Sequence, residues 1–106
     1  MNNQLLGVST AFEAFLNEAP EHSKAWMTAV QGLDAASALE KKTGHLAYLA
    51  VLAVLRLESG IPFHVRLAKE AGASRAEVIS AILVGLPAAG NTVTQALPVA
   101  LAAYDA

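Results

Sequence analysis

Hydrophobic residues recur along the chain at helical spacing, three or four positions apart, with polar residues between them. The first stripe consists of Leu5, Val8, Phe12, Phe15 and Leu16. It predicts a helix that ends near Ala19–Pro20. A second helix is expected from Pro20, because proline suits an opening turn, to Gly32, with Trp26, Met27 and Val30 on one face.

A longer apolar run, from about Leu39 to Leu57, predicts a central helix that is buried on most sides. Ser59–Gly60 interrupts this run, and Pro62 opens a fourth helix that should reach about Ala71. Gly72 suits a left-handed helix cap. Ser74 and Glu77 then have the capping-box spacing that starts a new helix.

A fifth helix is expected over Arg75–Leu86, and a sixth from Gly90–Asn91 that Pro98 kinks or shortens. Strand-like alternation of comparable strength is missing from the sequence. The pattern therefore predicts an all-α fold of about six helices. With 106 residues, the chain is expected to form one domain over positions 1–106.

The hydrophobic content of 55% and the mean hydropathy of +0.44 are high for so short a chain, since small domains have much surface to cover. A membrane span needs roughly 20 apolar residues, and Leu46–Leu55 is too short. The segment Val78–Tyr104 has no charged residue but is interrupted by Gly and Pro. We expect it to be buried between subunits, with Val84 and Leu97 as interface positions.

Charge and residue types exclude several functions. The net charge of −2 and the scattered basic residues argue against nucleic-acid binding. The absence of cysteine excludes disulfides, thiolate zinc sites and thiol catalysis, and makes a cytoplasmic location the simplest expectation. His22, His45 and His64 match no short metal-ligand motif, so neither a metal nor a cofactor is predicted.

One ordered set of motifs is more specific. Leu39 and Thr43 precede the apolar helix, His64 and Arg66 follow it, and Gly72 and the Ser74–Glu77 start come next. In order and spacing, the segment from Leu39 to Gly90 resembles the carboxymuconolactone decarboxylase family, which includes the alkylhydroperoxidase D branch. The resemblance implies an alkylhydroperoxidase D-like helical bundle that assembles into homo-trimers or homo-hexamers.

The resemblance also limits the chemistry. The Cys-x-x-Cys pair of the alkylhydroperoxidase D branch falls on Leu57 and Gly60, and its relay glutamate on His45. A dithiol peroxidase needs an attacking and a resolving thiol, so that activity is not expected. The decarboxylase branch also has His-x-Arg without the cysteine pair. His64 is therefore the position for which the resemblance implies a functional role in this chain.

Decarboxylation of a lactone acid needs a cation for the carboxylate and a proton donor for the carbon that loses it. Arg66 or Arg56 is the candidate cation, and His64 or His45 the candidate proton donor. His45, Leu49, Leu52 and Arg56 have the spacing of a single helical stripe, which would place a histidine and an arginine in one groove.

Trp26, Tyr48 and Phe63 could line a ligand pocket, with Trp26 and Phe63 as the substrate-binding candidates, although aromatic residues at helical spacing more often belong to a core. Two functions remain open at this point. One is a cofactor-free decarboxylase or related lyase acting on a small carboxylated lactone or organic acid through a histidine. The other is a non-catalytic small-molecule-binding or assembly protein on the same scaffold.

Overall fold

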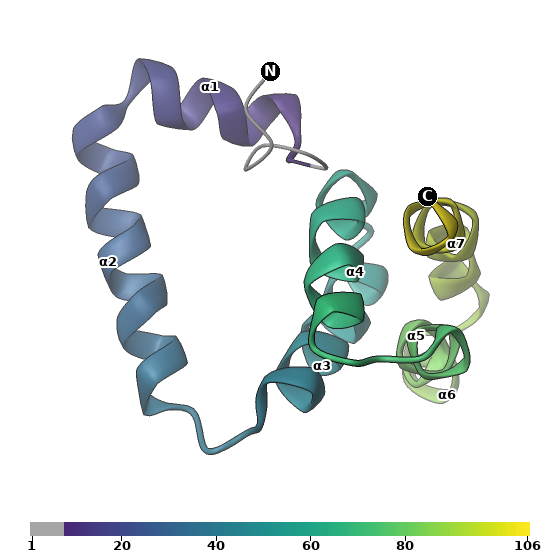
Figure 1. The fold of residues 1–106 in the computed structure, drawn as a ribbon. Helices are drawn as coiled ribbons and strands as arrows, with labels where there is room; N and C mark the ends of the chain where they lie inside the picture. Colours follow the sequence, from purple (N-terminus) through teal and green to yellow (C-terminus); the bar gives the residue numbers. More distant parts are fainter. Residues whose placement is uncertain (1–7) are drawn as a thin grey trace.

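The computed structural model describes residues 8–106, and all regular elements in this range are helical (Figure 1). The bundle is formed by α3 (Lys41–Val54), α4 (Ile61–Glu70), α5 (Arg75–Leu83) and α7 (Leu97–Asp105). Its connections include η2 (Glu58–Gly60), α6 (Leu86–Ala89) and η3 (Asn91–Ala96). Outside it lie α1 (Thr10–Glu18) and α2 (Pro20–Ala36). The all-α class predicted from the sequence is confirmed.

The core lies between α3, α4, α5, η3 and α7. Its buried hydrophobic residues are Leu49, Leu52, Ala53, Ile61, Val65, Ala68, Ala73, Val78, Ile82, Val93, Ala96 and Ala100. The helices α1 and α2 contribute no hydrophobic residue to this core. The hydrophobic effect therefore stabilises the bundle of residues 41–105 and leaves α2 almost entirely exposed.

All four prolines stand in the first turn of a helix: Pro20 in α2, Pro62 in α4, Pro87 in α6 and Pro98 in α7. Proline fits there because the amide hydrogen that it lacks has no partner within the helix. The predicted starts at Pro20 and Pro62 are confirmed. Pro98 opens α7 and does not kink a longer helix, and the fifth helix ends at Leu83 and not at Leu86.

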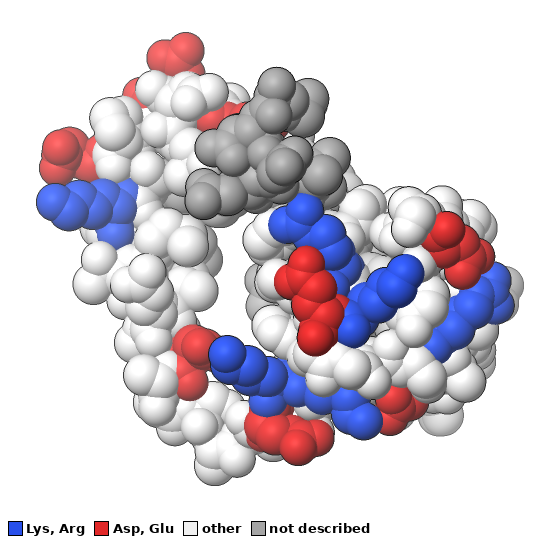
Figure 2. Space-filling model, in the orientation of Figure 1, with Lys and Arg blue, Asp and Glu red and all other residues white. Residues whose placement is uncertain are grey.

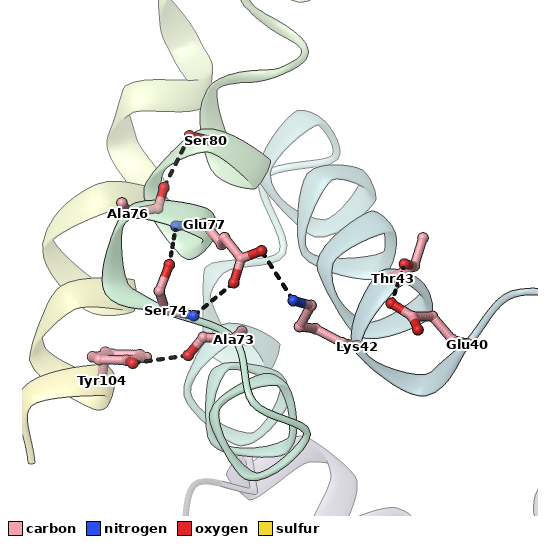
Figure 3. Close-up of polar contacts among 9 residues, drawn as sticks. All are labelled: Glu40, Lys42, Thr43, Ala73, Ser74, Ala76, Glu77, Ser80 and Tyr104. Atoms are coloured by element: carbon pink, nitrogen blue, oxygen red, sulfur yellow. Dashed lines mark hydrogen bonds and ion pairs between the residues drawn. The ribbon is translucent and has the colours of Figure 1, made fainter.

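The start of α5 contains the capping box predicted from the sequence (Figure 3). The Glu77 amide donates to the Ser74 hydroxyl oxygen at 3.1 Å, and the Ser74 amide donates to the Glu77 carboxylate at 2.8 Å. The same carboxylate pairs with Lys42 of α3 at 3.1 Å. Gly72 has the predicted left-handed conformation, with φ at +100°. The Glu77 carboxylate thus both caps α5 and links it to α3.

The C-terminal helix is attached to α4 and to the turn after it. The Tyr104 hydroxyl donates to the Ala73 carbonyl at 2.8 Å, and Lys69 Nζ donates to the Tyr104 carbonyl at 2.7 Å. Arg75 and Asp105 form a two-bond ion pair in which both bonds measure 3.0 Å. These contacts fix α7 against the start of α5.

Two further sequence predictions need correction, and one is not tested. The second helix does not stop at Gly32 but continues to Ala36, because the cost of an exposed helical glycine, about 1 kcal/mol, does not end a helix. The central helix covers 41–54, a shorter range than 39–57. Leu5, which the first stripe included, lies outside the described residues.

The uncharged segment Val78–Tyr104 packs mainly against other residues of its own chain. Val78, Ile82, Val93 and Ala100 are completely buried in its own core, and Leu97 packs against that core. Leu97 thus packs partly against its own core, and its place at a subunit interface stays a prediction. Val84, by contrast, is 67% exposed. The apolar surface that remains exposed lies chiefly on α2 and α3.

Candidate functional site

The structure brings His45 of α3 and His64 of α4 close enough for the charge of one to act on the other. Both side chains are partly buried. The pKa of His64 lies below its ordinary value of 6.5, chiefly because burial disfavours the imidazolium and secondly because of positive charge on His45. The His64 imidazole is therefore mostly neutral at pH 7 and has one donor and one acceptor nitrogen.

Two aromatic rings surround His64. The Tyr48 ring lies 4.4 Å from the His64 ring, centroid to centroid, and is tilted by 40°. The Phe63 ring lies at 5.4 Å and meets it edge to face. Tyr48 follows His45 by three positions on α3, so both lie on the side of that helix that adjoins α4.

Helical spacing favours a core position for Tyr48 over a pocket position, yet the residue is 48% exposed. The spacing of three from His45 was the available signal for a role in the site. Lys41 also lies near His45, and the sequence analysis did not predict it as a site residue. It precedes His45 by four residues, is exposed, and starts α3 on the same side.

Arg56 does not share a groove with His45, which corrects the predicted stripe. The α3 helix ends at Val54, and Arg56 has a φ of +60°. A left-handed residue turns the chain out of the helical path. Arg56 Nε instead donates to Glu58 at 2.8 Å on the exposed end of the helix. The stripe therefore stops at Leu52, which is buried.

Arg66 packs on Phe63, with its guanidinium carbon 5.3 Å from the ring centroid, and lies 3.9 Å from Glu70. Two positions separate it from His64 on α4, so the two side chains leave the helix on different sides. Trp26 lies on α2, whose substantial packing is against α1. Of the predicted substrate-binding residues, Phe63 meets the His64 ring edge to face.

Other motif residues have structural roles. The Thr43 hydroxyl donates to the Glu40 carboxylate at 3.0 Å, next to the first turn of α3 (Figure 3). Gly72, Ser74 and Glu77 make the turn and cap described above. His22 is exposed on α2. Within residues 8–106, no group of three or more His, Asp or Glu side chains is arranged to hold a metal ion.

The surface of the bundle has two open hollows between α3 and α5. One runs from Glu40, Lys42 and Glu77 to Val84, and the other adjoins Val51, Leu55 and Gly85. Neither histidine lines either hollow. The histidine pair thus lies on the other side of α3, where the chain by itself leaves Tyr48 open to water.

Together these features define a cysteine-free helical bundle with a neutral histidine held between α3 and α4. The model of the carboxymuconolactone decarboxylase family matches residues 20–102, and the chain belongs to this family. No curated protein and no solved structure matches the chain.

The match extends the resemblance to α2, which the motifs had not covered. The positions to which the resemblance assigns the peroxidase cysteines are Leu57, half exposed after α3, and Gly60, the last residue of η2. Neither residue has a thiol. Among the helices of residues 8–106, none combines the length and the apolar character that crossing a membrane requires.

Proposed function

We propose that this protein is a cofactor-free decarboxylase or related lyase that acts on a small carboxylated lactone or organic acid, with His64 as the general acid and base. The observation that carries the proposal is the pairing of His64 with His45 beside Tyr48. Membership of the family supports the substrate class.

The proposed reaction needs one proton transfer at carbon. The C–C bond to the carboxylate breaks, carbon dioxide leaves, and the electron pair moves into the adjacent unsaturated carbonyl as an enolate. The carbon then takes a proton from the imidazolium form of His64. A lowered pKa makes that imidazolium a stronger acid, and the neutral imidazole regains its proton from water.

The carboxylate needs a cation before the bond breaks. Lys41 precedes His45 by one turn on the same side of α3, and we propose that its ammonium binds the carboxylate. Arg66 and Arg56 remain predictions for this role. His45 assists by opposing full protonation of His64.

The test measures carbon dioxide release from a panel of small carboxylated lactones and their open-chain acids. His64→Ala is expected to abolish release while helix content stays unchanged, and Lys41→Gln to raise KM more than it lowers kcat. His22→Gln removes an exposed histidine on α2 and serves as the matched control. Turnover that survives in His64→Ala would contradict the proposed role.

A further inference from the structure

Tyr48 presents an aromatic ring to solvent beside the proposed acid and base. Its ring contacts the His64 ring, with the centroids 4.4 Å apart, yet the residue is 48% exposed. The other tyrosine, Tyr104, has a structural role, because its hydroxyl donates to the Ala73 carbonyl and Lys69 Nζ lies 4.7 Å from its ring centroid. The His64 ring covers one part of Tyr48, and the exposed part is open to a molecule from solution.

Lys41 and Tyr48 lie almost in line along α3. Seven residues separate them, which is two helical turns, or about 10 Å along the axis with a difference in direction of about 20°. His45 lies between them on the same side of the helix. Lys41 is exposed. This side of α3 therefore presents a cation, a histidine and an aromatic ring in that order.

The positive charge of Lys41 is local. On the face shown in Figure 2, basic and acidic side chains lie next to one another over the bundle, and the net charge of the chain is −2. The carboxylate of Glu40, the preceding residue, accepts a hydrogen bond from Thr43 and lines the hollow towards α5. An anion beside His45 is therefore attracted by a single nearby ammonium and not by a broad positive field.

We infer that this side of α3 binds planar aromatic carboxylates, with the Tyr48 ring stacked on the ring of the ligand and the Lys41 ammonium on its carboxylate. Aromatic rings attract one another in offset or edge-to-face arrangements, beyond the effect of the area that they bury. Tyr48 is then the residue that determines specificity, because it favours a flat ring over a puckered ring of the same size. The role of Lys41 rests on the proposed function, but the ligand class extends beyond lactone acids.

A ring stacked on Tyr48 also lies close to His64, because the two side chains are in contact. The resonances of the His64 imidazole protons should therefore shift when the ligand binds. Their assignment follows from their loss in His64→Gln. NMR titration of these protons gives a dissociation constant without any turnover.

Benzoate and cyclohexanecarboxylate are the matched probes, since each joins a six-membered carbon ring to one carboxylate. Burial of apolar surface does not favour benzoate, because the saturated ring has at least as much apolar surface to bury. Stacking on Tyr48 does favour benzoate. We expect wild type to bind benzoate about 2- to 10-fold more tightly than cyclohexanecarboxylate.

Tyr48→Leu keeps an apolar side chain at an exposed position but removes the ring, so the bundle should still fold and the preference for benzoate should disappear. Tyr48→Phe keeps the ring and is the matched control, with the preference of wild type. Lys41→Gln should weaken the binding of both acids by the same factor. Trp26→Leu removes a second exposed ring, on α2, and should leave the preference unchanged.

Three results would overturn the inference: neither acid shifts the His64 resonances of wild type, both acids bind equally, or the preference for benzoate survives in Tyr48→Leu. A preference that is lost in Trp26→Leu and kept in Tyr48→Leu would also contradict it, because the aromatic contact would then come from α2. A protein that prefers benzoate through Tyr48 but releases no carbon dioxide from any lactone acid refutes the proposed function and not this inference. An active enzyme without the preference refutes the inference and not the proposed function.

Discussion

The Tyr48 ring lies against the His64 imidazole, with the ring centroids 4.4 Å apart and the planes tilted by 40°. This contact joins α3 to α4 at a point where His45 also acts on His64 through its charge. It makes Tyr48 part of the solvent barrier around a neutral histidine. The ring, and not the hydroxyl, should carry this effect, because the contact is between the two rings.

Tyr48→Ala should raise the pKa of His64 toward 6.5, because water then reaches the imidazole and stabilises its charged form. NMR titration of the imidazole protons measures this change. Tyr48→Phe keeps the ring and should leave the pKa of His64 where it is. A pKa that rises equally in both variants would show that the phenol hydroxyl, and not the ring, controls the site.

Acid should weaken the fold through His64. Because the pKa of His64 is lowered in the folded state, the unfolded chain binds the proton more readily. The contribution of neutral His64 to stability is therefore complete above pH 6.5 and is lost as the pH falls from 6.5 through the folded pKa. The free energy of unfolding of wild type should fall more steeply over this window than that of His64→Gln.

Urea unfolding at a series of pH values checks this, with His22→Gln as the control for an exposed imidazole on α2. The free energy of unfolding of His22→Gln should depend on pH in the same way as that of wild type. Parallel curves for wild type and His64→Gln below pH 6.5 would mean that the burial of His64 has no effect on stability.

The capping box should stabilise α5 and the whole bundle. Ser74→Ala removes the acceptor for the Glu77 amide and should lower the free energy of unfolding by about 1 kcal/mol. Glu77→Gln keeps the bond to the Ser74 amide but loses the charge that pairs with Lys42. Its loss should be smaller, and it should shrink further at high salt, because salt screens partly exposed ion pairs. Chemical denaturation at two salt concentrations separates the effects.

Gly85 should be required by close packing and not by backbone conformation. A Cβ atom added there would lie 2.8 Å from Cγ2 of Val54, and a β-branched side chain in a helix has little freedom to move away. Gly85→Ala should therefore cost about 1–3 kcal/mol. The double variant with Val54→Ala should recover most of this loss.

Gly32→Ala is the matched control for the same substitution. Its Cβ atom meets nothing within 4 Å, so it should stabilise α2 by about 0.5–1 kcal/mol. Thermal unfolding of the four proteins gives the comparison. A neutral Gly85→Ala would show that Val54 yields without cost.

The starts of the helices could be predicted from the sequence because their causes are local. The Ser74–Glu77 box and the prolines at positions 20 and 62 act within one helical turn of their own residues. The all-α class and the family followed from the same short-range patterns together with the motifs around His64. The ends of the helices were harder to predict, because the sequence has only weak signals for the end of α3 at Val54 and for the continuation of α2 past Gly32.

The tertiary structure alone decided which of these residues meet. The predicted helical stripe would place Arg56 beside His45, but the left-handed turn at Arg56 directs that residue away from the stripe. The packing of α3 on α4 instead places His64 next to His45 and Tyr48. Packing also decided which apolar residues are buried, since the uncharged segment covers its own core while Trp26, Val30 and Leu33 of α2 stay exposed. Hydrogen bonds within a helix span four residues, whereas contacts between helices depend on crossing geometry that no local pattern contains.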